Sequence, residues 1–338
     1  NSKEMASPFF YFYGSLNPFY TKKRLESCHS GIFCYNVVMK AYENAGINKN
    51  TAAFLLRSYY LYRSKGEAPM IYDCHLHTEF SGDSNTPISL QIEKAIELGM
   101  KEMCITDHHD YDSGFCDCDF ILDIPTYLTS LRMLQAEYRD RIRINIGIEL
   151  GLQDHLKEYL DHFVKRYGDS FDFIIGSSHF VKSMDPYDPE YWNKRGEVPG
   201  FEDFFEASLV RVRDLCRTFD SFGHLDYAVR YAPHQNDFYD YRHLSQWIDP
   251  LLKILIENGK SLECNTGGFK YGLGQPNPCR KILMRYRELG GEMITIGSDA
   301  HTPEYVGYAF DTCRELLSDC GYRYFTVYHG RKPEFIPL

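Results

Sequence analysis

Short strand-like runs alternate with longer helix-like segments over most of the chain, from about residue 70 onward. The strand-like runs lie at 71–75, 102–106, 142–148, 171–176, 220–224, 261–265, 292–297 and 323–328. Between them, helix-like segments lie at 87–98, 124–138, 154–166, 201–219, 243–257, 278–289 and 308–318. Pro near the start and Gly just past the end suit helix boundaries. Strands that alternate with helices of this length predict parallel βαβ units.

The number of units favours a barrel. About seven βαβ units are present, and no Gly-x-Gly-x-x-Gly turn of a dinucleotide-binding fold follows the first strand. We therefore expect residues 70–338 to form one catalytic domain, a distorted (β/α)7 barrel of the TIM type. In such a barrel the reactive groups collect at the carboxyl ends of the strands. No sequence repeat of fixed period points to a solenoid.

Composition excludes several classes of protein. The chain has 338 residues, 43% of them apolar, and no stretch approaches the roughly 18 apolar residues of a membrane span. Eleven cysteines lack the paired spacing of a zinc ribbon, and no secretory signal opens the chain, so we expect a cytoplasmic protein. A net charge of −10 argues against nucleic acid as a partner. The sequence does not indicate an oligomeric state.

The first 69 residues differ in composition from the rest. They hold nine Lys or Arg, four Glu, no Asp and fourteen Phe or Tyr, without a clear helical or strand period. A disordered tail would be poor in aromatic residues, and a transit peptide would be rich in Arg and Ser. Lys65-Gly66-Glu67 can be encoded by a purine-rich ribosome-binding sequence, which suggests that Met70 is the true start and that residues 1–69 are an over-extended reading of the gene. The alternative is an accessory segment with a helix around 49–62.

Two histidine-containing pairs follow strand-like runs at opposite ends of the predicted barrel domain. His75 and His77 follow the first run, and Asp299 and His301 follow the run at 292–297. Residues two apart on a strand project to the same face, so each pair can present two metal-binding groups side by side. Imidazoles mixed with carboxylates favour zinc, iron or manganese. Metal-assisted hydrolysis is the first hypothesis.

Further candidate ligands recur after the other strands. A single His-x-His pattern is weak evidence, because polar alternation on a solvated strand face is common, and the weight here comes from repetition. Most of these candidates close a short β-branched or aromatic run and precede a loop or helix. They are Asp83, His108, Glu149, His179 and His224.

The ordered series of motifs resembles that of the PHP (polymerase and histidinol phosphatase) superfamily. The series comprises His75-x-His77, Ser81-x-Asp83, Thr106-Asp107-His108, Gly147-x-Glu149, Ser178-His179, Gly223-His224-x-Asp226 and Ser298-Asp299-Ala300-His301. The resemblance covers residues 70 to about 337. Four longer stretches resemble the histidinol-phosphatase branch, namely 120–125, 147–152, 224–231 and 267–274.

The resemblance implies that nine ligands hold three divalent ions, which would be zinc, iron or manganese. The first ion would take His75, His77, Glu149 and Asp299, the second Glu149 with His179 and His224, and the third Asp83, His108 and His301. Successive strand residues point oppositely, so only one of His108 and His109 should enter the cluster, and the Thr-Asp-His motif selects His108. His109 is instead expected to line the substrate pocket or to support a ligand.

The implied reaction is hydrolysis of L-histidinol phosphate to L-histidinol and phosphate in histidine biosynthesis. The positive charge of three divalent ions outweighs three carboxylates and would attract a small phosphate ester to an acidic protein. A hydroxide bridging the first two ions would attack phosphorus in line. Glu149, Asp299 and His301 are the expected catalytic residues, and Asp299 or His301 would assist the leaving alkoxide.

Candidate substrate contacts follow from the charge of each end of the substrate. Arg230 and Lys270 could bind phosphate oxygens, although a surface ion pair is almost as good an explanation for Arg230. The acidic loop 110–119 could receive the cationic amine and imidazole, and a solvated acidic loop is the alternative. Its acids are Asp110, Asp112, Asp117 and Asp119.

Other readings of the chain have less support. The sequence has neither the Gly-x-Ser-x-Gly elbow of a serine hydrolase nor the His-Glu-x-x-His motif of a zincin. Within the superfamily, the rival is a phosphoesterase for another small phosphate ester or a nucleotide, including a proofreading exonuclease. Among proteins that are not enzymes, the rival is a non-catalytic metal-binding protein derived from such a barrel. Loss of activity should have been accompanied by loss of at least one ligand, and all nine are present.

Overall fold

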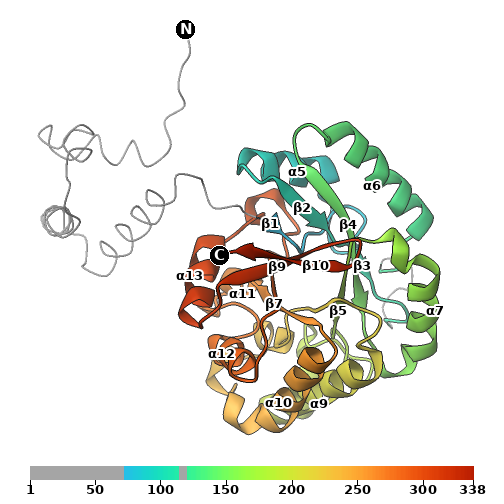
Figure 1. The fold of residues 1–338 in the computed structure, drawn as a ribbon. Coiled ribbons are helices and arrows are strands. Elements are labelled where there is room, and N and C mark those ends of the chain that lie inside the picture. Colours follow the sequence, from blue (N-terminus) through green and yellow to red (C-terminus); the bar gives the residue numbers. More distant parts are fainter. Residues whose placement is uncertain (1–71, 114–119) are drawn as a thin grey trace, which may run out of the picture. The chain divides into compact units, whose positions relative to one another are not determined.

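The computed structural model of the protein describes residues 72–113 and 120–338 (Figure 1). All of them belong to one unit, Met70–Leu338. Three predictions lie outside the described residues: the start at Met70, the helix around 49–62, and any role for Asp117 and Asp119.

Seven parallel strands form a closed ring. Neighbouring strands follow the order β1-β2-β4-β5-β6-β7-β8, and every pair along this path is parallel. The ring closes where the His77 N–H donates to the Ala300 carbonyl (3.0 Å) and the Asp299 N–H donates to the His75 carbonyl (2.9 Å). The predicted seven-stranded barrel is confirmed. Its strands are β1 (Tyr72–Asp73), β2 (Glu102–Ile105), β4 (Arg143–Gly151), β5 (Phe173–Ser177), β6 (Ser221–Phe222), β7 (Ser261–Asn265) and β8 (Ile294–Gly297).

One strand of the barrel is broken. Strand β2 ends at Ile105, and two residues later the chain pairs with β4 again as β3 (His108–His109). His108 lies opposite Glu149 in this register. The break places a histidine directly beside a carboxylate near the carboxyl end of β4.

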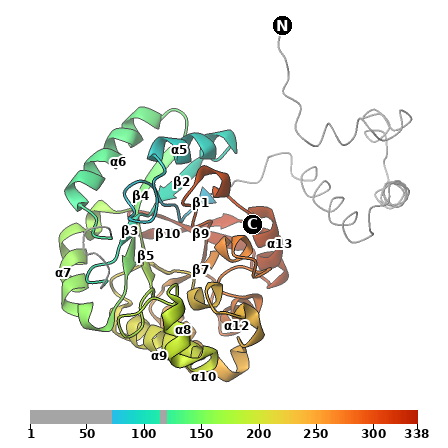
Figure 2. The same cartoon turned by 180° about the vertical axis from the view of Figure 1, so that it is seen from behind.

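Helices surround the ring of strands on its outer side (Figures 1 and 2). The larger ones are those predicted, with boundaries that differ by at most four residues. Short 3-10 turns join them: η1 (Asp154–Leu156), η2 (Gly168–Ser170), η3 (Tyr227–Arg230), η4 (Gln235–Asp237) and η5 (Pro303–Tyr305). The α-helices are α5 (Ile88–Glu97), α6 (Ile124–Tyr138), α7 (Lys157–Tyr167), α8 (Pro189–Arg195), α9 (Glu197–Leu215), α10 (Tyr241–Glu257), α11 (Gly267–Lys270), α12 (Arg280–Glu288) and α13 (Phe310–Asp319). None of the helices in the described ranges is long and apolar enough to cross a membrane.

Helix α10 shows how local sequence sets these elements. The Asp240 side chain accepts a hydrogen bond from the Arg242 N–H at its start (3.0 Å) and so caps one of the unpaired amides of the first turn. Leu244, Ile248 and Leu255 are buried, and their spacing places them on one stripe of a 3.6-residue helix. That stripe packs against the barrel and anchors the helix there.

The chain ends in a hairpin that covers the amino-terminal end of the barrel; its first strand is the predicted run at 323–328, and its second strand was not predicted. Strands β9 (Tyr324–His329) and β10 (Lys332–Pro337) are antiparallel, and their two-residue loop has positive φ at Gly330 (53°) and Arg331 (61°). The Tyr328 hydroxyl is 2.8 Å from the Ser261 hydroxyl at the start of β7. The guanidinium of Arg331 donates to both carboxylate oxygens of Asp220, just before β6. The hairpin therefore closes the end of the barrel opposite to the carboxyl ends of the strands.

We predict that Arg331→Ala lowers the free energy of unfolding by about 2 kcal/mol, because it leaves the buried Asp220 carboxylate without its charged donor. Arg323→Ala is the matched control, since Arg323 is exposed and forms no ion pair within the described part of the chain. Urea denaturation of both variants measures the difference. Equal stabilities would show that the hairpin is not held through Asp220.

Candidate metal centre

The nine predicted ligands lie at the carboxyl end of the barrel. His108 opens β3, Glu149 lies near the end of β4, and Asp83 lies in the loop after β1; each of the others follows a strand. Eight of the nine side chains are at most 22% exposed, and Asp83, at 42%, marks the rim. Residues separated by more than 200 positions in the chain thus meet at one end of the molecule.

Glu149 lies at the centre of the group. Its Oε2 is 2.9 Å from His108 Nδ1, 3.3 Å from His75 Nε2 and 3.5 Å from His77 Nε2. Its Oε1 is 2.9 Å from His224 Nε2 and 3.3 Å from His179 Nε2. One buried carboxylate therefore touches imidazoles from five places in the chain.

Asp299 is the second carboxylate of the group. Its Oδ1 lies 3.3 Å from His77 Nε2, 3.8 Å from His75 Nε2 and 3.7 Å from His301 Nδ1. Its backbone has φ 57°, in the left-handed region that non-glycine residues rarely adopt. The surrounding structure holds this conformation, which turns the carboxylate inward after β8.

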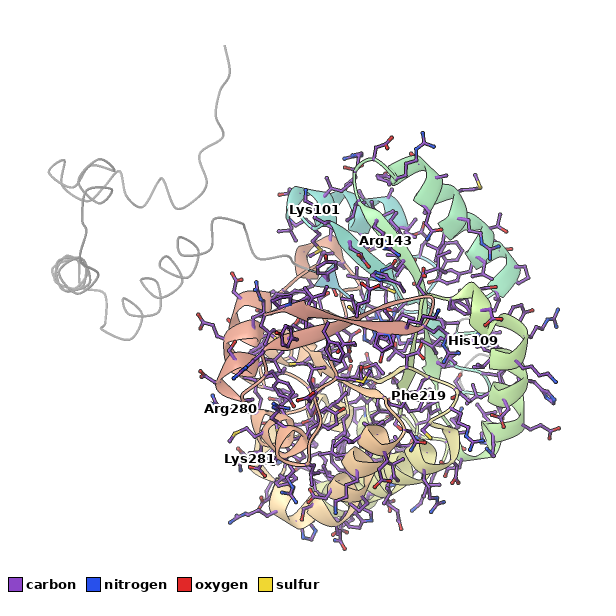
Figure 3. All side chains as sticks on the ribbon, in the orientation of Figure 1. Lys101, His109, Arg143, Phe219, Arg280 and Lys281 are labelled. Atoms are coloured by element: carbon purple, nitrogen blue, oxygen red, sulfur yellow. The ribbon has the colours of Figure 1, made fainter. Side chains whose placement is uncertain are left out.

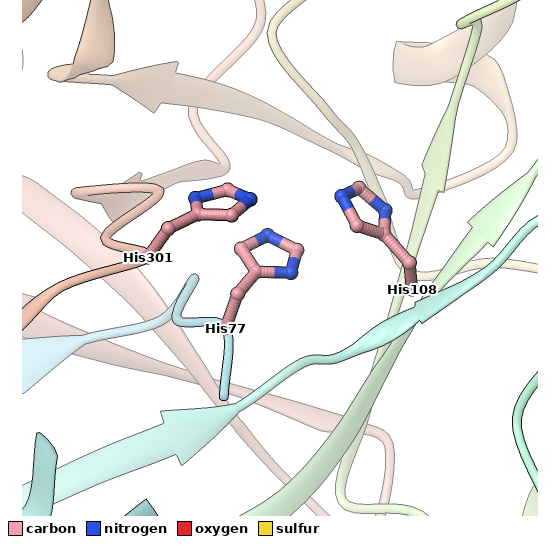
Figure 4. A group of neighbouring side chains, drawn as sticks. All are labelled: His77, His108 and His301. Carbon is pink, nitrogen blue, oxygen red and sulfur yellow. The ribbon is translucent and has the colours of Figure 1, made fainter. Parts of the chain in front are cut away.

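A third set of ligand atoms lies toward the rim. His301 Nε2 is 3.0 Å from Asp83 Oδ2, and His108 Nε2 is 3.6 Å from the same oxygen. The ring of His77 stacks on those of His108 and His301, with centroids 4.2 Å apart in both cases (Figure 4). The three rings converge on one volume from three separate segments.

The donor atoms fit bound cations. In the described part of the chain, four triads have ligand atoms within 4.8 Å of one another. Glu149 Oε2 and His224 Nδ1 are buried without a hydrogen bond of normal geometry, which is costly unless another group contacts them. The four triads are His77 with His108 and His301; His75 with His77 and Asp299; His75 with Glu149 and His224; and His108 with Asp110 and His179.

The electrostatics also favour a cation. Burial opposes the charge on Glu149, but His75 and His108 hold the pKa of this carboxyl well below its usual value. Burial would lower the pKa of His179, yet Asp110 and Glu149 raise it to about 10. For His77, burial and the neighbouring His301 and His108 lower the pKa to about 3. Carboxylates that attract protons to these imidazoles would equally attract divalent ions, which bind neutral imidazole and release the protons.

Glu263 supports two of the candidate ligands and was not anticipated from the sequence. It lies on β7, and its Oε1 is 2.6 Å from His75 Nδ1 while its Oε2 accepts from the His224 N–H (2.8 Å). A carboxylate on the far ring nitrogen fixes the tautomer and orientation of a ligating histidine. The one clue in the sequence was the position of Glu263, a carboxylate inside the strand-like run at 261–265.

Asp110 has a different role from the predicted one. Its Oδ1 lies 2.8 Å from His179 Nδ1, and its Oδ2 lies 3.4 Å from His108 Nδ1. Asp112 pairs with His155 at the surface (2.8 Å). Neither is therefore placed to receive a cationic substrate, because Asp110 is committed to the histidine cluster and Asp112 points to the outside.

His109 points away from the centre, as strand alternation requires, and its contact with substrate stays a prediction. Its Nδ1 accepts a hydrogen bond from the Leu122 N–H (3.1 Å), and its Nε2 is 2.7 Å from the Tyr159 hydroxyl. Its ring stacks on Phe163 of α7. Figure 3 labels His109 at the edge of the barrel where the helices pack. Both ring nitrogens are engaged by packing partners rather than by the cluster.

Arg230 is buried beside the centre rather than in a surface ion pair. Its guanidinium donates to Asp299 Oδ2 (2.7 Å), Asn277 Oδ1 (2.8 Å) and Asn265 Oδ1 (2.8 Å). Three of its five N–H donors are engaged, which leaves two for a ligand. The charge of Arg230 helps to hold the pKa of Asp299 well below the usual value against the effect of burial.

Lys270 lies at the half-buried edge of the same region. Its ammonium group lies over the ring of Tyr305, 4.4 Å from the centroid. Burial lowers its pKa, and the charge of Asp299 opposes this shift. Lys270 therefore stands close enough to the centre to contribute positive charge there.

Comparison with known proteins agrees with this geometry. The PHP domain family model matches residues 73–267. The chain belongs to the PHP domain family. This match contains His75, His77, Asp83, His108, Glu149, His179 and His224, and Asp299 and His301 lie beyond it.

Individual PHP proteins match over nearly their whole length. The histidinol-phosphatase of Lactococcus lactis is 30% identical over 264 residues, which is 77% of this chain and 95% of the relative. A protein of Clostridium acetobutylicum named "probable histidinol-phosphatase" is 31% identical over 258 residues, 74% of this chain and 94% of the relative. The crystal structure of the L. lactis histidinol phosphate phosphatase, complexed with zinc, L-histidinol and phosphate, matches with a TM-score of 0.72 and 29% identity, covering 79% of this chain and 100% of that one.

We predict that Glu263→Gln weakens the binding of Zn²⁺ by about 10- to 100-fold, because His75 loses the carboxylate that orients it. Competition with a chromophoric chelator measures the affinity. Glu257→Gln, at the exposed end of α10, is the control and should bind zinc like the unaltered protein. Equal affinity in both variants would rule out the supporting role of Glu263.

Proposed function

We propose that this protein is a metal-dependent phosphatase that hydrolyses L-histidinol phosphate to L-histidinol and phosphate. The observation that carries the proposal is the convergence of nine imidazole and carboxylate side chains, with Glu149 at their centre, at the open end of the barrel. Relatives named histidinol-phosphatase match over most of the chain, and one of them has been crystallised with zinc and both reaction products.

We assign the nine side chains to three divalent ions. His75, His77, Glu149 and Asp299 would hold the first, and Glu149 would be shared with the second, held also by His179 and His224. Asp83, His108 and His301 would hold the third. The donor set of imidazole nitrogens and carboxylate oxygens suits zinc, iron or manganese. When bound, such ions lower the pKa of water, orient phosphoryl oxygens and stabilise the leaving oxygen.

Protein side chains would position the phosphate group. Two N–H groups of Arg230 have no acceptor among the described residues, so Arg230 can donate to a phosphoryl oxygen while it holds the Asp299 carboxylate. Lys270 adds a positive charge from the edge of the site. The dianionic phosphate would thus lie between the bound cations, Arg230 and Lys270.

Glu149, Asp299 and His301 form the proposed catalytic set. Glu149 lies between the surrounding histidine side chains and contacts their ring nitrogens. Arg230 keeps Asp299 ionised by donating to Oδ2, so Oδ1 would be free to hold the first ion. Within this set Asp299 and His301 are more exposed than Glu149, so they are the candidates for giving a proton to the leaving alkoxide oxygen.

The setting of this reaction would be the cytoplasm, where histidine biosynthesis consumes histidinol phosphate. A small phosphate ester is the proposed partner, and neither nucleic acid nor a membrane is required. The main rival is a PHP phosphoesterase that acts on a nucleotide or on another small phosphate ester.

The first test compares substrates. Purified protein supplied with Zn²⁺ or Mn²⁺ should release phosphate from histidinol phosphate with a kcat/KM at least about 100-fold above that for nucleoside monophosphates, which corresponds to about 2.7 kcal/mol of discrimination. Chelation by EDTA should abolish the activity, and added metal should restore it. Hydrolysis of nucleotides without hydrolysis of histidinol phosphate would overturn the proposal.

A second test uses Glu149. Glu149→Gln removes the shared charge, so we expect loss of bound metal and a fall in kcat of roughly 10³-fold or more, about 4 kcal/mol of barrier. His109→Gln should keep its metal content near normal, since His109 faces away from the centre. Elemental analysis and phosphate release report the two quantities, and full metal content in Glu149→Gln would refute the ligand assignment.

A further inference from the structure

Asp185 is an acidic residue beside the candidate metal centre that the proposed chemistry leaves without a role. It lies in the loop between β5 and α8, the helix that comes into view from the back of the molecule (Figure 2). Its Oδ1 accepts hydrogen bonds from the Tyr187 N–H (2.7 Å) and the Tyr227 hydroxyl (3.2 Å). The ring of Tyr227 in turn lies 5.3 Å from that of His179 and 5.2 Å from that of His224. One tyrosine ring therefore separates Asp185 from the imidazoles of the centre.

Asp185 forms no ion pair with any residue that the structure describes, and the charge of His179 acts on it only from beyond the ring of Tyr227. Glu149, Asp299 and Asp83, by contrast, all form ion pairs. The carboxylate is half-buried, and both of its hydrogen bonds go to Oδ1. A partly desolvated carboxylate without a counter-ion is unfavourable, and a cationic ligand would relieve this cost.

A run of tyrosine rings connects Asp185 with Arg230. The ring of Tyr231 lies 5.1 Å from that of Tyr227, 5.2 Å from that of Tyr187 and 5.4 Å from that of Tyr271. The Arg230 guanidinium lies over Tyr271, 5.1 Å from the centroid. Such aromatic faces attract organic cations through their π electrons.

The two ends of the site thus carry opposite charges. Arg230 and Lys270 lie at the end near Asp299, and Asp185 lies at the end near His179. A ligand with a phosphate at one end and a positive charge at the other would match this arrangement in one orientation only. Histidinol phosphate has this form, since its amine is protonated at neutral pH.

We propose that Asp185, with the faces of Tyr227 and Tyr231, binds the cationic amino-imidazole end of the substrate and so selects positively charged phosphate esters. This inference rests on the proposed function and specifies which residue sets its substrate preference. It replaces the predicted role of the acidic loop 110–119, whose described carboxylates are engaged elsewhere.

The test compares Asp185→Asn with Asp188→Asn. Asp188 lies three residues further on, is exposed, and caps α8 by accepting the Glu190 N–H (2.8 Å), which an asparagine can also do. Both variants lose the same charge from the same loop. For Asp185→Asn we expect kcat/KM for histidinol phosphate to fall by about 10- to 100-fold and that for propyl phosphate, which has no positive charge, to stay within about two-fold. Asp188→Asn should leave both values unchanged.

Product inhibition provides a second readout. In Asp185→Asn the inhibition constant of histidinol should rise by a similar factor, while that of inorganic phosphate should not change. Tyr227→Phe, which removes the hydroxyl and keeps the ring, should shift the histidinol constant in the same direction by a smaller factor. Equal losses for both substrates, or an unchanged histidinol constant, would overturn the role of Asp185.

The two proposals can fail separately. If the unaltered protein did not hydrolyse histidinol phosphate, the proposed function would be wrong. The preference for phosphoethanolamine over ethyl phosphate would then test Asp185 on its own. Loss of that preference in Asp185→Asn would support its role, and its absence in the unaltered protein would overturn it.

Discussion

The burial of the Glu149 carboxylate among five imidazoles is the interaction on which the rest of this structure depends. A charged carboxylate or a protonated imidazole is costly to bury alone, and each of these groups is acceptable here only because the others surround it. Parallel strand pairing positions Glu149, since the register of β4 places it opposite His108 on one side and Ile175 on the other. A shift of one residue in this register would turn Glu149 away from the cluster.

The loops around the centre are held by carboxylates that bind backbone amides rather than metal. Asp73 accepts from the N–H groups of Ser298 and Gly307 (both 2.9 Å) and so ties β1 to the segment that carries Asp299. Asp107 accepts from the Thr78 N–H (2.6 Å) and the Ser81 hydroxyl (2.7 Å). Because these supports are buried, the ligand atoms are positioned before any ion or substrate arrives. This preorganisation is what electrostatic catalysis requires.

The two ends of the barrel have different tasks. The hairpin β9–β10 closes the amino end with a tyrosine hydroxyl and an arginine–carboxylate pair. The carboxyl end stays open toward Asp83 and His301, the more exposed members of the ligand group. Chemistry at the open end can therefore change through its loops without disturbing the closed end. The aromatic run between Asp185 and Arg230 is one such local feature, carried by residues that follow β5, β6 and β7.

The sequence by itself determined the order of strands and helices, the closed barrel and the residues that would gather at its carboxyl end. The order of elements follows from local periodicity, and the candidate residues follow from spacing along a strand. Strand alternation allowed only one of His108 and His109 to face the cluster, the family resemblance selected His108, and His108 is the one that contacts Glu149. Only the tertiary structure decided which distant groups meet. Glu263 lies 188 residues from His75, and no local pattern couples them. The same holds for the contact of Asp110 with His179 and for the three acceptors that Arg230 binds. Strand β10 could not be predicted either, because its exposed residues lack an apolar alternation. Such partnerships depend on strand register and loop closure, which are properties of the folded whole.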